Sequence, residues 1–155
     1  MKDQDWKVRE LALGVLANQL VAKEYAKEIA ELLSDQAASV RASAAQALAS
    51  LGAREQKKDI ALLLTDTEKW TNPQFDIFPG EHTVKGAAAR ALARLGAKEY
   101  VKDISRFLKD EHWDSRCSAV WALTELQATE YTQDIAALLG DSSENVRMFA
   151  VMALG

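Results

Sequence analysis

The sequence predicts an all-α protein, an α-solenoid of about nine helices in which neighbouring helix pairs hide one another's apolar faces. Two observations lead to this prediction: a pattern recurs along the chain, and the apolar residues of each copy follow the period of an α-helix. The copies begin at Val8, Val40, Val84, Ser115 and Val146, so successive copies start 32, 44, 31 and 31 residues apart. No stretch shows the convincing alternation of a half-buried strand.

The first helix of each copy, called here the Val-Arg helix, is illustrated by residues 40–51. Apolar residues stand at its first position and then four, seven, eight and eleven residues later. This spacing places them on one stripe of a helix. In two copies the helix is followed by Leu-Gly-Ala, with Gly52 and Gly96 in the middle. We expect these glycines to end their helices in the left-handed conformation.

The second helix of each copy is shorter, as in residues 99–109, where Ile104, Phe107 and Leu108 are expected to point inward. One such pair cannot bury its own apolar stripe, so we expect stacked copies to share one continuous core. Small side chains in the stripes allow the helices to approach closely: Ala44, Ala47, Ala88, Ala91, Ala119 and Ala122.

Charged residues also recur in register. An aspartate stands six residues before an arginine in the pairs Asp35/Arg41, Asp110/Arg116 and Asp141/Arg147. This spacing places the acid in the turn between copies and the base in the first turn of the next helix. We expect a ladder of charge-assisted hydrogen bonds, each contributing ~1.5–3 kcal/mol where it is partly buried. The arginines are therefore interpreted as structural.

The pattern V-R-x-x-A-x-x-A-L…L-G-A…I-x-x-L-L-x-D resembles a HEAT repeat of the short bacterial type that is also found in phycobilin lyases. The resemblance covers residues 6–155. It implies a right-handed superhelix of antiparallel helix pairs, with the Val-Arg helices on the concave side. In that frame residues 1–155 form one domain, in which a lone helix (6–20) precedes the pairs 21–52, 53–96, 97–127 and 128–155.

Composition and charge exclude several classes of function. The 155 residues are 48% apolar, and 19 basic against 23 acidic residues give a net charge of −4, unlike the strong positive excess of a general nucleic-acid binder. No apolar run approaches the roughly 18 residues that span a bilayer, and the first residues lack a signal-peptide core. Cys117 is the only cysteine. We expect a cytoplasmic protein with an inert thiol and neither nucleic-acid nor membrane partners.

The clearest break in the pattern is the insert 67–83, which has 17 residues where the other links have four. It contains both prolines and the aromatic residues Trp70, Phe75 and Phe78. A loop of this length is either a folded flap or a partner-binding arm. The structural alternative is that its aromatic side chains only pin the loop to the adjacent helices.

A second break is chemical. Positions of the Val-Arg helices that we expect to point away from the core are small or polar in the early copies, but apolar near the C-terminus. We therefore expect an apolar concave patch that binds a partner, contacts further repeats outside this chain, or mediates self-association through the C-terminal end. The patch residues are Cys117, Val120, Trp121, Thr124, Met148, Val151 and Met152. Arg90 and Arg94 occupy outward positions after the insert, where they either bind an acidic group or are simply solvated.

Motifs for catalysis are not found. The sequence lacks the glycine-rich phosphate-binding patterns, H-E-x-x-H and G-x-S-x-G. Glu81-His82 and Glu111-His112 precede successive Val-Arg helices. However, HEAT-like iron hydroxylases carry His-Glu within the helix, where this chain has none. We expect no cofactor, no metal and no enzymatic activity.

The favoured function is a non-enzymatic protein-interaction scaffold that binds a protein partner through its concave helices and the insert. The candidate contact residues are Trp70, Phe75, Phe78 and Trp121 as apolar anchors, with Arg90 and Arg94 as polar contacts, because aromatic and arginine side chains dominate binding hot spots. The alternatives are a chromophore-binding protein similar to phycobilin lyases, or a fragment of a longer HEAT solenoid.

Overall fold

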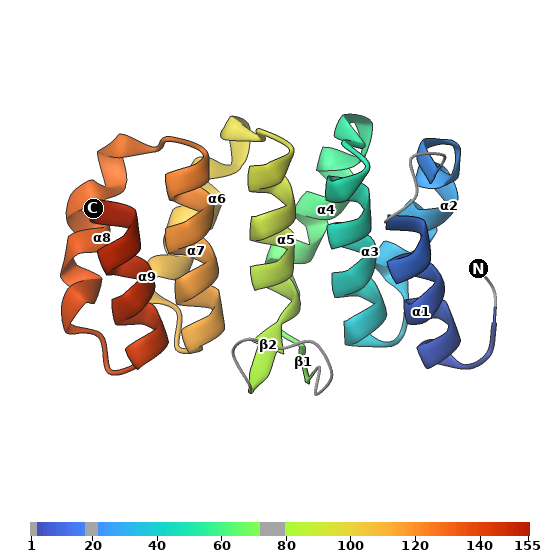
Figure 1. Ribbon diagram of the computed structural model, residues 1–155, viewed down its shortest axis with the longest axis horizontal. Coiled ribbons are helices and arrows are strands. Elements are labelled where there is room, and N and C mark those ends of the chain that lie inside the picture. Colours follow the sequence, from blue (N-terminus) through green and yellow to red (C-terminus); the bar gives the residue numbers. More distant parts are fainter. Residues whose placement is uncertain (1–2, 18–21, 72–79) are drawn as a thin grey trace.

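The computed structural model describes residues 3–17, 22–71 and 80–155, and within them nine α-helices form two layers (Figure 1). The front layer consists of the Val-Arg helices α1 (Trp6–Ala17), α3 (Ala38–Ser50), α5 (Val84–Arg94), α7 (Trp113–Glu125) and α9 (Glu144–Leu154). The second layer consists of α2 (Ala26–Glu31), α4 (Lys57–Leu62), α6 (Val101–Ser105) and α8 (Thr132–Ala137). The prediction of an all-α solenoid is confirmed.

Short 3₁₀ helices extend both ends of each second-layer helix. They are Ala22–Tyr25 and Leu32–Ser34 around α2, Arg54–Gln56 and Leu63–Thr65 around α4, Lys98–Tyr100 and Arg106–Lys109 around α6, and Thr129–Tyr131 and Leu138–Gly140 around α8. None of the helices in the described ranges is both long and apolar enough to cross a bilayer.

The Val-Arg helices pack directly against one another along the whole row, whereas the second-layer helices contact each other less. In Figure 1, α4 and α6 lie behind the row, whereas α8 is seen beside α9. The resemblance to HEAT repeats places the closely packed row of Val-Arg helices on the concave side of the stack, and the exposed face of this row is called the concave side below.

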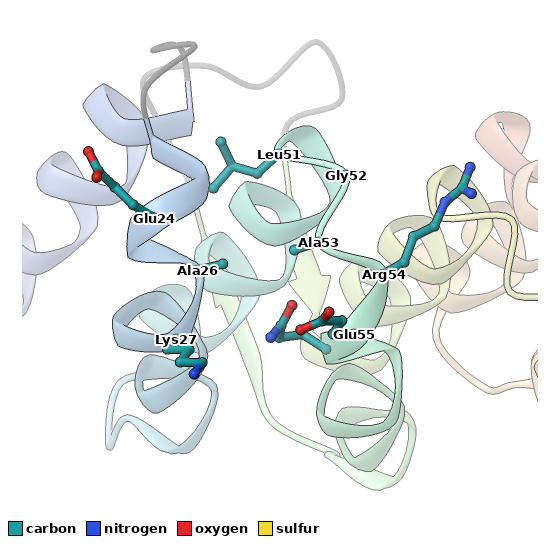
Figure 2. Close-up of a pocket in the computed structure, with 9 residues that line it drawn as sticks. Glu24, Ala26, Lys27, Leu51, Gly52, Ala53, Arg54 and Glu55 are labelled. Atoms are coloured by element: carbon teal, nitrogen blue, oxygen red, sulfur yellow. The ribbon is translucent and has the colours of Figure 1, made fainter.

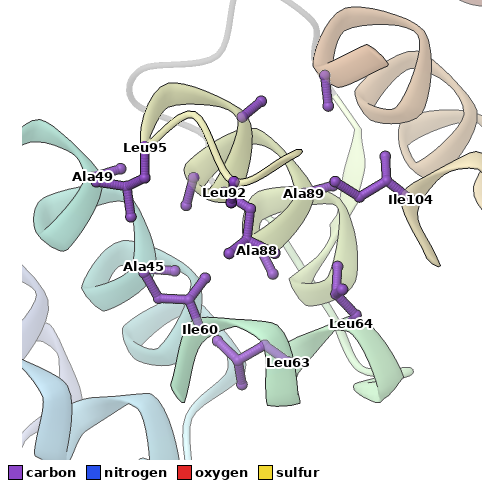
Figure 3. Packing of buried hydrophobic residues seen from close by; sticks show 14 of the residues in the cluster. Ala45, Ala49, Ile60, Leu63, Leu64, Ala88, Ala89, Leu92, Leu95 and Ile104 are labelled. Atoms are coloured by element: carbon purple, nitrogen blue, oxygen red, sulfur yellow. The ribbon is translucent and has the colours of Figure 1, made fainter. Parts of the chain in front are cut away.

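The core runs between the two layers and through the seams between neighbouring Val-Arg helices. Figure 3 shows one section, where Ala45 and Ala49 of α3 lie near Ile60 of α4 and Leu92 of α5. All four side chains are buried. Alanines in these seams keep the backbones close enough to exclude water, so the repeats share one core.

These seams correct one expectation. Cys117 and Val120 were expected in an exposed concave patch, but both are buried, as are Ala42 and Ala45 at the corresponding positions of α3. A Val-Arg helix in the middle of the row is covered on both flanks by its neighbours, so these positions face the next helix. Of the predicted patch on α7, Trp121 is half-buried and Thr124 exposed. On α9, Met148, Val151 and Met152 are exposed.

The predicted helix ends are confirmed. Gly52 and Gly96 both have φ of 65°, the left-handed conformation that closes a helix. In the next copy Gln127 takes this place with φ of 57°. A residue with a side chain in this left-handed conformation costs about 1–2 kcal/mol of folding free energy relative to glycine. The turn at Gln127 nevertheless has the same backbone conformation as the turns at Gly52 and Gly96.

The ladder of charges is present, but its geometry differs from the predicted one. Arg41 Nη1 donates to the main-chain oxygen of Asp35, six residues earlier, at 2.8 Å. Its partner carboxylate is instead Asp66 in the next turn, 2.7 Å from Arg41 Nε. The other rungs join Arg9 to Asp35, Lys85 to Asp110 and Arg116 to Asp141. Each rung thus ties a Val-Arg helix to the turn that begins the next one.

The base of the insert is a two-stranded antiparallel ribbon, β1 (Lys69–Thr71) and β2 (Glu81–Thr83), with Trp70 opposite His82. The expectation that the chain contains no strands is therefore wrong here. Three-residue strands are too short to show an alternating pattern in the sequence. The ribbon lies beside the first turn of α5 (Figure 1).

Candidate partner-binding surface

The junction between α5 and α7 is organised around one buried carboxylate, Asp114, which is 2% exposed. Its Oδ1 accepts hydrogen bonds from His82 Nδ1 at 2.9 Å and from Arg90 Nη1 at 3.2 Å. Its Oδ2 accepts from the Thr83 main-chain nitrogen at 2.8 Å and the Thr83 hydroxyl at 2.9 Å. Four donors from β2 and α5 therefore converge on one acid of α7.

These contacts keep Asp114 ionised. Burial opposes its charge, but the hydrogen bond from His82, the positive charge of Arg90 and the hydrogen bond from the Thr83 N–H outweigh it. Together they hold the pKa of Asp114 well below its usual range. Since a carboxylate only accepts hydrogen bonds, His82 carries a proton on Nδ1.

Close approach of α5 to this acid requires a glycine. A β-carbon on Gly86 would lie 2.7 Å from Asp114 Oδ2 and from Thr83 Oγ1, and 2.8 Å from Ser118 Oγ. Thr83 caps α5 by accepting a hydrogen bond from the Gly86 nitrogen, and its hydroxyl also lies 3.0 Å from Ser115 Oγ. The insert is thus joined to α5 and α7 through buried polar groups.

Three of the predicted contact residues meet on the concave side of this junction. Arg90 bridges Asp114 and the hydroxyl of Ser118, to which it donates. One turn further along α5, the guanidinium of Arg94 lies over the ring of Trp121, 5.8 Å from its centroid. Arg94 is exposed and Trp121 half-buried. The surface therefore offers a cation and an aromatic face to solvent.

Trp70 lies at the base of the insert in a row of neighbouring rings that pack in tilted, edge-to-face and stacked arrangements. Its centroid is 5.5 Å from that of His82, which lies 5.7 Å from Trp113, and Trp113 in turn stacks on His112. The indole Nε1 of Trp70 is buried and has no hydrogen-bond partner among the described residues. Trp70 thus packs on the fold, in keeping with the structural alternative for the insert's aromatics. Phe75 and Phe78 lie outside the described residues.

The two histidines have structural contacts. His112 Nδ1 accepts a hydrogen bond from the Asp114 nitrogen at 3.3 Å and so caps α7. Burial, with Lys69 nearby, lowers the pKa of His112 despite the acids around it. Within the described ranges, no three histidine, cysteine or acidic side chains are grouped so as to hold a metal ion.

Cys117 is one turn into α7, beneath this cluster. Burial, together with the negative charge of Asp114, raises the pKa of its thiol to about 12. A thiol in that state has almost no nucleophilic thiolate at neutral pH, as expected from the sequence.

Sequence reasoning missed Asp114, Thr83, Ser118 and Trp113 as parts of this junction. The available signals were Gly86, which stands where α3 has Ala42, and Asp114, which directly precedes the serine that replaces the repeat's first valine. Neither signal could have paired the two residues, because 28 positions separate them and only the stacking brings them together.

A separate hollow lies at the opposite, N-terminal part of the solenoid, between the start of α2 and the turn after α3 (Figure 2). It is lined by both acids and bases, including Glu24, Lys27, Arg54 and Glu55. These residues are not gathered around a buried polar group, so the hollow has no defined chemistry for a ligand.

Comparison with known proteins identifies the repeat. The family model for HEAT repeats matches residues 1–71 and 80–155, whereas no curated protein matches the chain significantly. Among solved structures, the complex of CpcE and CpcF of phycocyanin lyase from Nostoc sp. PCC7120 is 22% identical, with a TM-score of 0.69 over 99% of this chain and 57% of that one. YibA from Escherichia coli is 20% identical, with a TM-score of 0.68 over 99% of this chain and 55% of that one.

A designed armadillo repeat protein in complex with the peptide (KR)4 is also similar, at 18% identity and a TM-score of 0.56 over 99% of this chain and 78% of that one. At such identities the likeness extends to the fold alone. The chain spans little more than half the length of the lyase and YibA chains. Because the family model matches nearly all of the sequence, the chain belongs to the HEAT-repeat family.

Proposed function

We propose that this protein is a non-enzymatic scaffold that binds a protein partner on the concave side of α5 and α7, next to the insert. The observation that carries the proposal is the exposed Arg94 guanidinium over the Trp121 ring. No carboxylate lies within 4 Å of Arg94 among the described residues. Arginine and tryptophan are the residue types most enriched in binding hot spots.

The surface chemistry indicates what the partner presents. Arg94 supplies donors for a carboxylate, and the exposed part of the Trp121 ring supplies an apolar face beside it. Arg90 is less available, because Asp114 and Ser118 already hold one of its nitrogens. The proposed partner segment therefore carries an acidic side chain next to an apolar one. HEAT and armadillo repeats generally bind proteins, which supports a protein partner.

The first experiment compares proteins captured by the wild type with those captured by Arg94→Ala and Trp121→Ala. Leu62→Ala is the matched control, since Leu62 is an exposed apolar residue of α4 in the other layer. We expect at least one partner that is retained by the control and weakened on the order of tenfold or more by each concave variant. Equal capture of every partner by all four proteins contradicts the proposed surface.

The contribution of the insert needs a variant that spares its base. Thr83 caps α5 and His82 binds Asp114, so removal of all of 67–83 would damage the fold. The sharper variant keeps both strands and replaces residues 72–80 with Asn-Gly, a two-residue hairpin turn. We expect an unchanged helical circular dichroism spectrum and lost partner binding. Full binding would remove the insert from the proposal.

A second candidate function rests on the likeness to the phycocyanin lyase subunits. If the chain binds an open-chain tetrapyrrole, addition of bilin will produce a visible absorbance band that remains with the protein through gel filtration. The Trp121→Ala variant then distinguishes a concave binding site from adsorption elsewhere.

A further inference from the structure

We propose that copies of this chain associate head to tail, so that α9 of one copy packs against α1 of the next and Arg147 forms a ladder rung with Asp3. The contact would repeat the junction that already joins successive Val-Arg helices within the chain. It involves the two ends of the row and leaves the surface of α5 and α7 free.

The internal rungs define what a complete rung contains. Arg116 Nη2 lies 2.7 Å from Asp141 Oδ1, and its Nη1 donates to the main-chain oxygen of Asp110. The acid of each rung also accepts a hydrogen bond from the main-chain nitrogen two residues later, as Asp141 does from Ser143 at 2.8 Å. A rung is therefore an arginine, a main-chain oxygen before it, and an aspartate held by its own turn.

Asp3 has the features of a rung acid without its arginine. Its Oδ1 accepts a hydrogen bond from the Asp5 nitrogen at 2.9 Å, and its main-chain oxygen accepts from Arg9 Nη1 at 2.7 Å. It precedes Val8 by five residues, just as Asp35 precedes Val40. No basic side chain lies within 4 Å of its carboxylate in the described part of the chain.

Arg147 is the complementary half. Its Nη1 donates to the main-chain oxygens of Asp141 and Ser142, at 2.8 and 3.2 Å. Across the described ranges, however, it makes no ion pair with any carboxylate. Arg9, Arg41 and Arg116 all direct Nε to the aspartate of the following turn. Asp3 and Arg147 are thus oppositely charged. Asp3 has the geometry of the acid in an internal rung, and Arg147 has that of the arginine.

The apolar surfaces at the two ends match in the same way. On α9, Met148 and Val151 are exposed, although the equivalent Ala42 and Ala45 of α3 are fully buried against α5. On α1, Leu11 is 70% exposed, although the equivalent Ala87 of α5 is fully buried. Each exposed set occupies positions that a neighbouring Val-Arg helix covers elsewhere in the row.

The register of the internal junctions predicts the contacts between copies. Glu10 of α1 accepts a hydrogen bond from Ser43 of α3, so the third residue of one Val-Arg repeat motif faces the fourth residue of the next. The same register places Met148 of one copy against Leu11 of the following copy. Because this contact joins two different surfaces, it produces open chains of copies whose length grows with concentration.

The test is the mass of the full chain in solution, measured by sedimentation at several protein concentrations and salt concentrations. We expect reversible, concentration-dependent association that weakens with salt. Asp3→Arg and Arg147→Asp should each raise the dissociation constant about tenfold or more. The double variant Asp3→Arg/Arg147→Asp restores opposite charges across the contact and should recover association.

Leu11→Glu and Met148→Lys test the apolar part, one at each end, and each should abolish association. Leu62→Glu is the control, because Leu62 is equally exposed but lies on the outer layer. Circular dichroism of every variant shows whether it is folded. A wild type that stays monomeric at all concentrations overturns the proposal, and so does a double variant no better than the single ones.

Discussion

The α3–α5 junction and the α5–α7 junction join the same kind of helices with different chemistry. At the first, Ala42 and Ala87 occupy the facing positions, and the seam is closed by apolar contact. At the second, the same positions are Gly86 and Ser118, and the seam holds an ionised carboxylate with four donors. The comparison teaches that a solenoid can replace an apolar seam with a polar one where an inserted segment must be attached.

The polar seam has consequences for specificity. An alanine seam tolerates small shifts between helices, because contact between methyl groups has little directionality. The Asp114 cluster fixes His82, Thr83 and Arg90 to single hydrogen-bonding positions. The second strand at the base of the insert and the Arg90 guanidinium are therefore held in a defined place beside α7, the helix that carries Trp121.

The largest expected effect comes from Asp114→Ala. The change leaves the buried donors of His82, Thr83 and Arg90 without their acceptor, and loss of one member of a buried charged network costs about 3–5 kcal/mol. The measurement is the free energy of unfolding in urea. Glu68→Ala is the matched control, since Glu68 also pairs with an arginine, Arg41, but its side chain is 62% exposed. The control should lose less than about 1 kcal/mol. Equal losses would show that the buried seam contributes no more than a surface pair.

A smaller effect is expected for Gly86→Ala. The added methyl group would overlap the oxygens of Asp114 and Thr83, and such overpacking costs about 1–3 kcal/mol. Gly14→Ala provides the contrast, because nothing lies within 4 Å of a β-carbon on that helical glycine. It should stabilise the protein by about 0.5–1 kcal/mol. Thermal unfolding midpoints will move in opposite directions, whereas a stabilised Gly86→Ala variant would mean that α5 can move away from α7 freely.

The smallest expected effect is a pH dependence from His112. Its pKa is lowered in the folded protein, mainly by burial, so the unfolded chain binds the proton first as the pH falls below about 6.5. The contribution of neutral His112 to the free energy of unfolding is therefore complete above that pH. It is lost as the pH falls from about 6.5 to the lower pKa that His112 has in the folded protein. His112→Asn keeps an acceptor at the helix cap and removes this titration. The wild type should lose stability more steeply than the variant on acidification below about pH 6.5. Parallel pH profiles would contradict this role.

Much of the architecture could be predicted from particular residues. The stripe that starts at Val40 gave the length and inner face of α3, and Gly52 and Gly96 gave the helix ends, because each depends on local periodicity or backbone conformation. The predicted exposure of Cys117 and Val120 was wrong, because one stripe per helix ignores the neighbours on either flank. The ladder pairing was only half right for a similar reason, since Asp35 lies nearer in sequence to Arg41 but offers it only a main-chain oxygen.

The sequence by itself determined the repeat, the helices and the place of the insert, because these follow from short-range spacing of apolar side chains, glycines and a break in that spacing. Only the tertiary structure decided that Gly86 of α5 would meet Asp114 of α7, that Arg94 would lie over Trp121, and that Asp3 and Arg147 would take the first and last positions of one ladder. Each of these depends on the stacking of one repeat on the next. That stacking decides which residues come into contact, and their separation along the chain does not predict it.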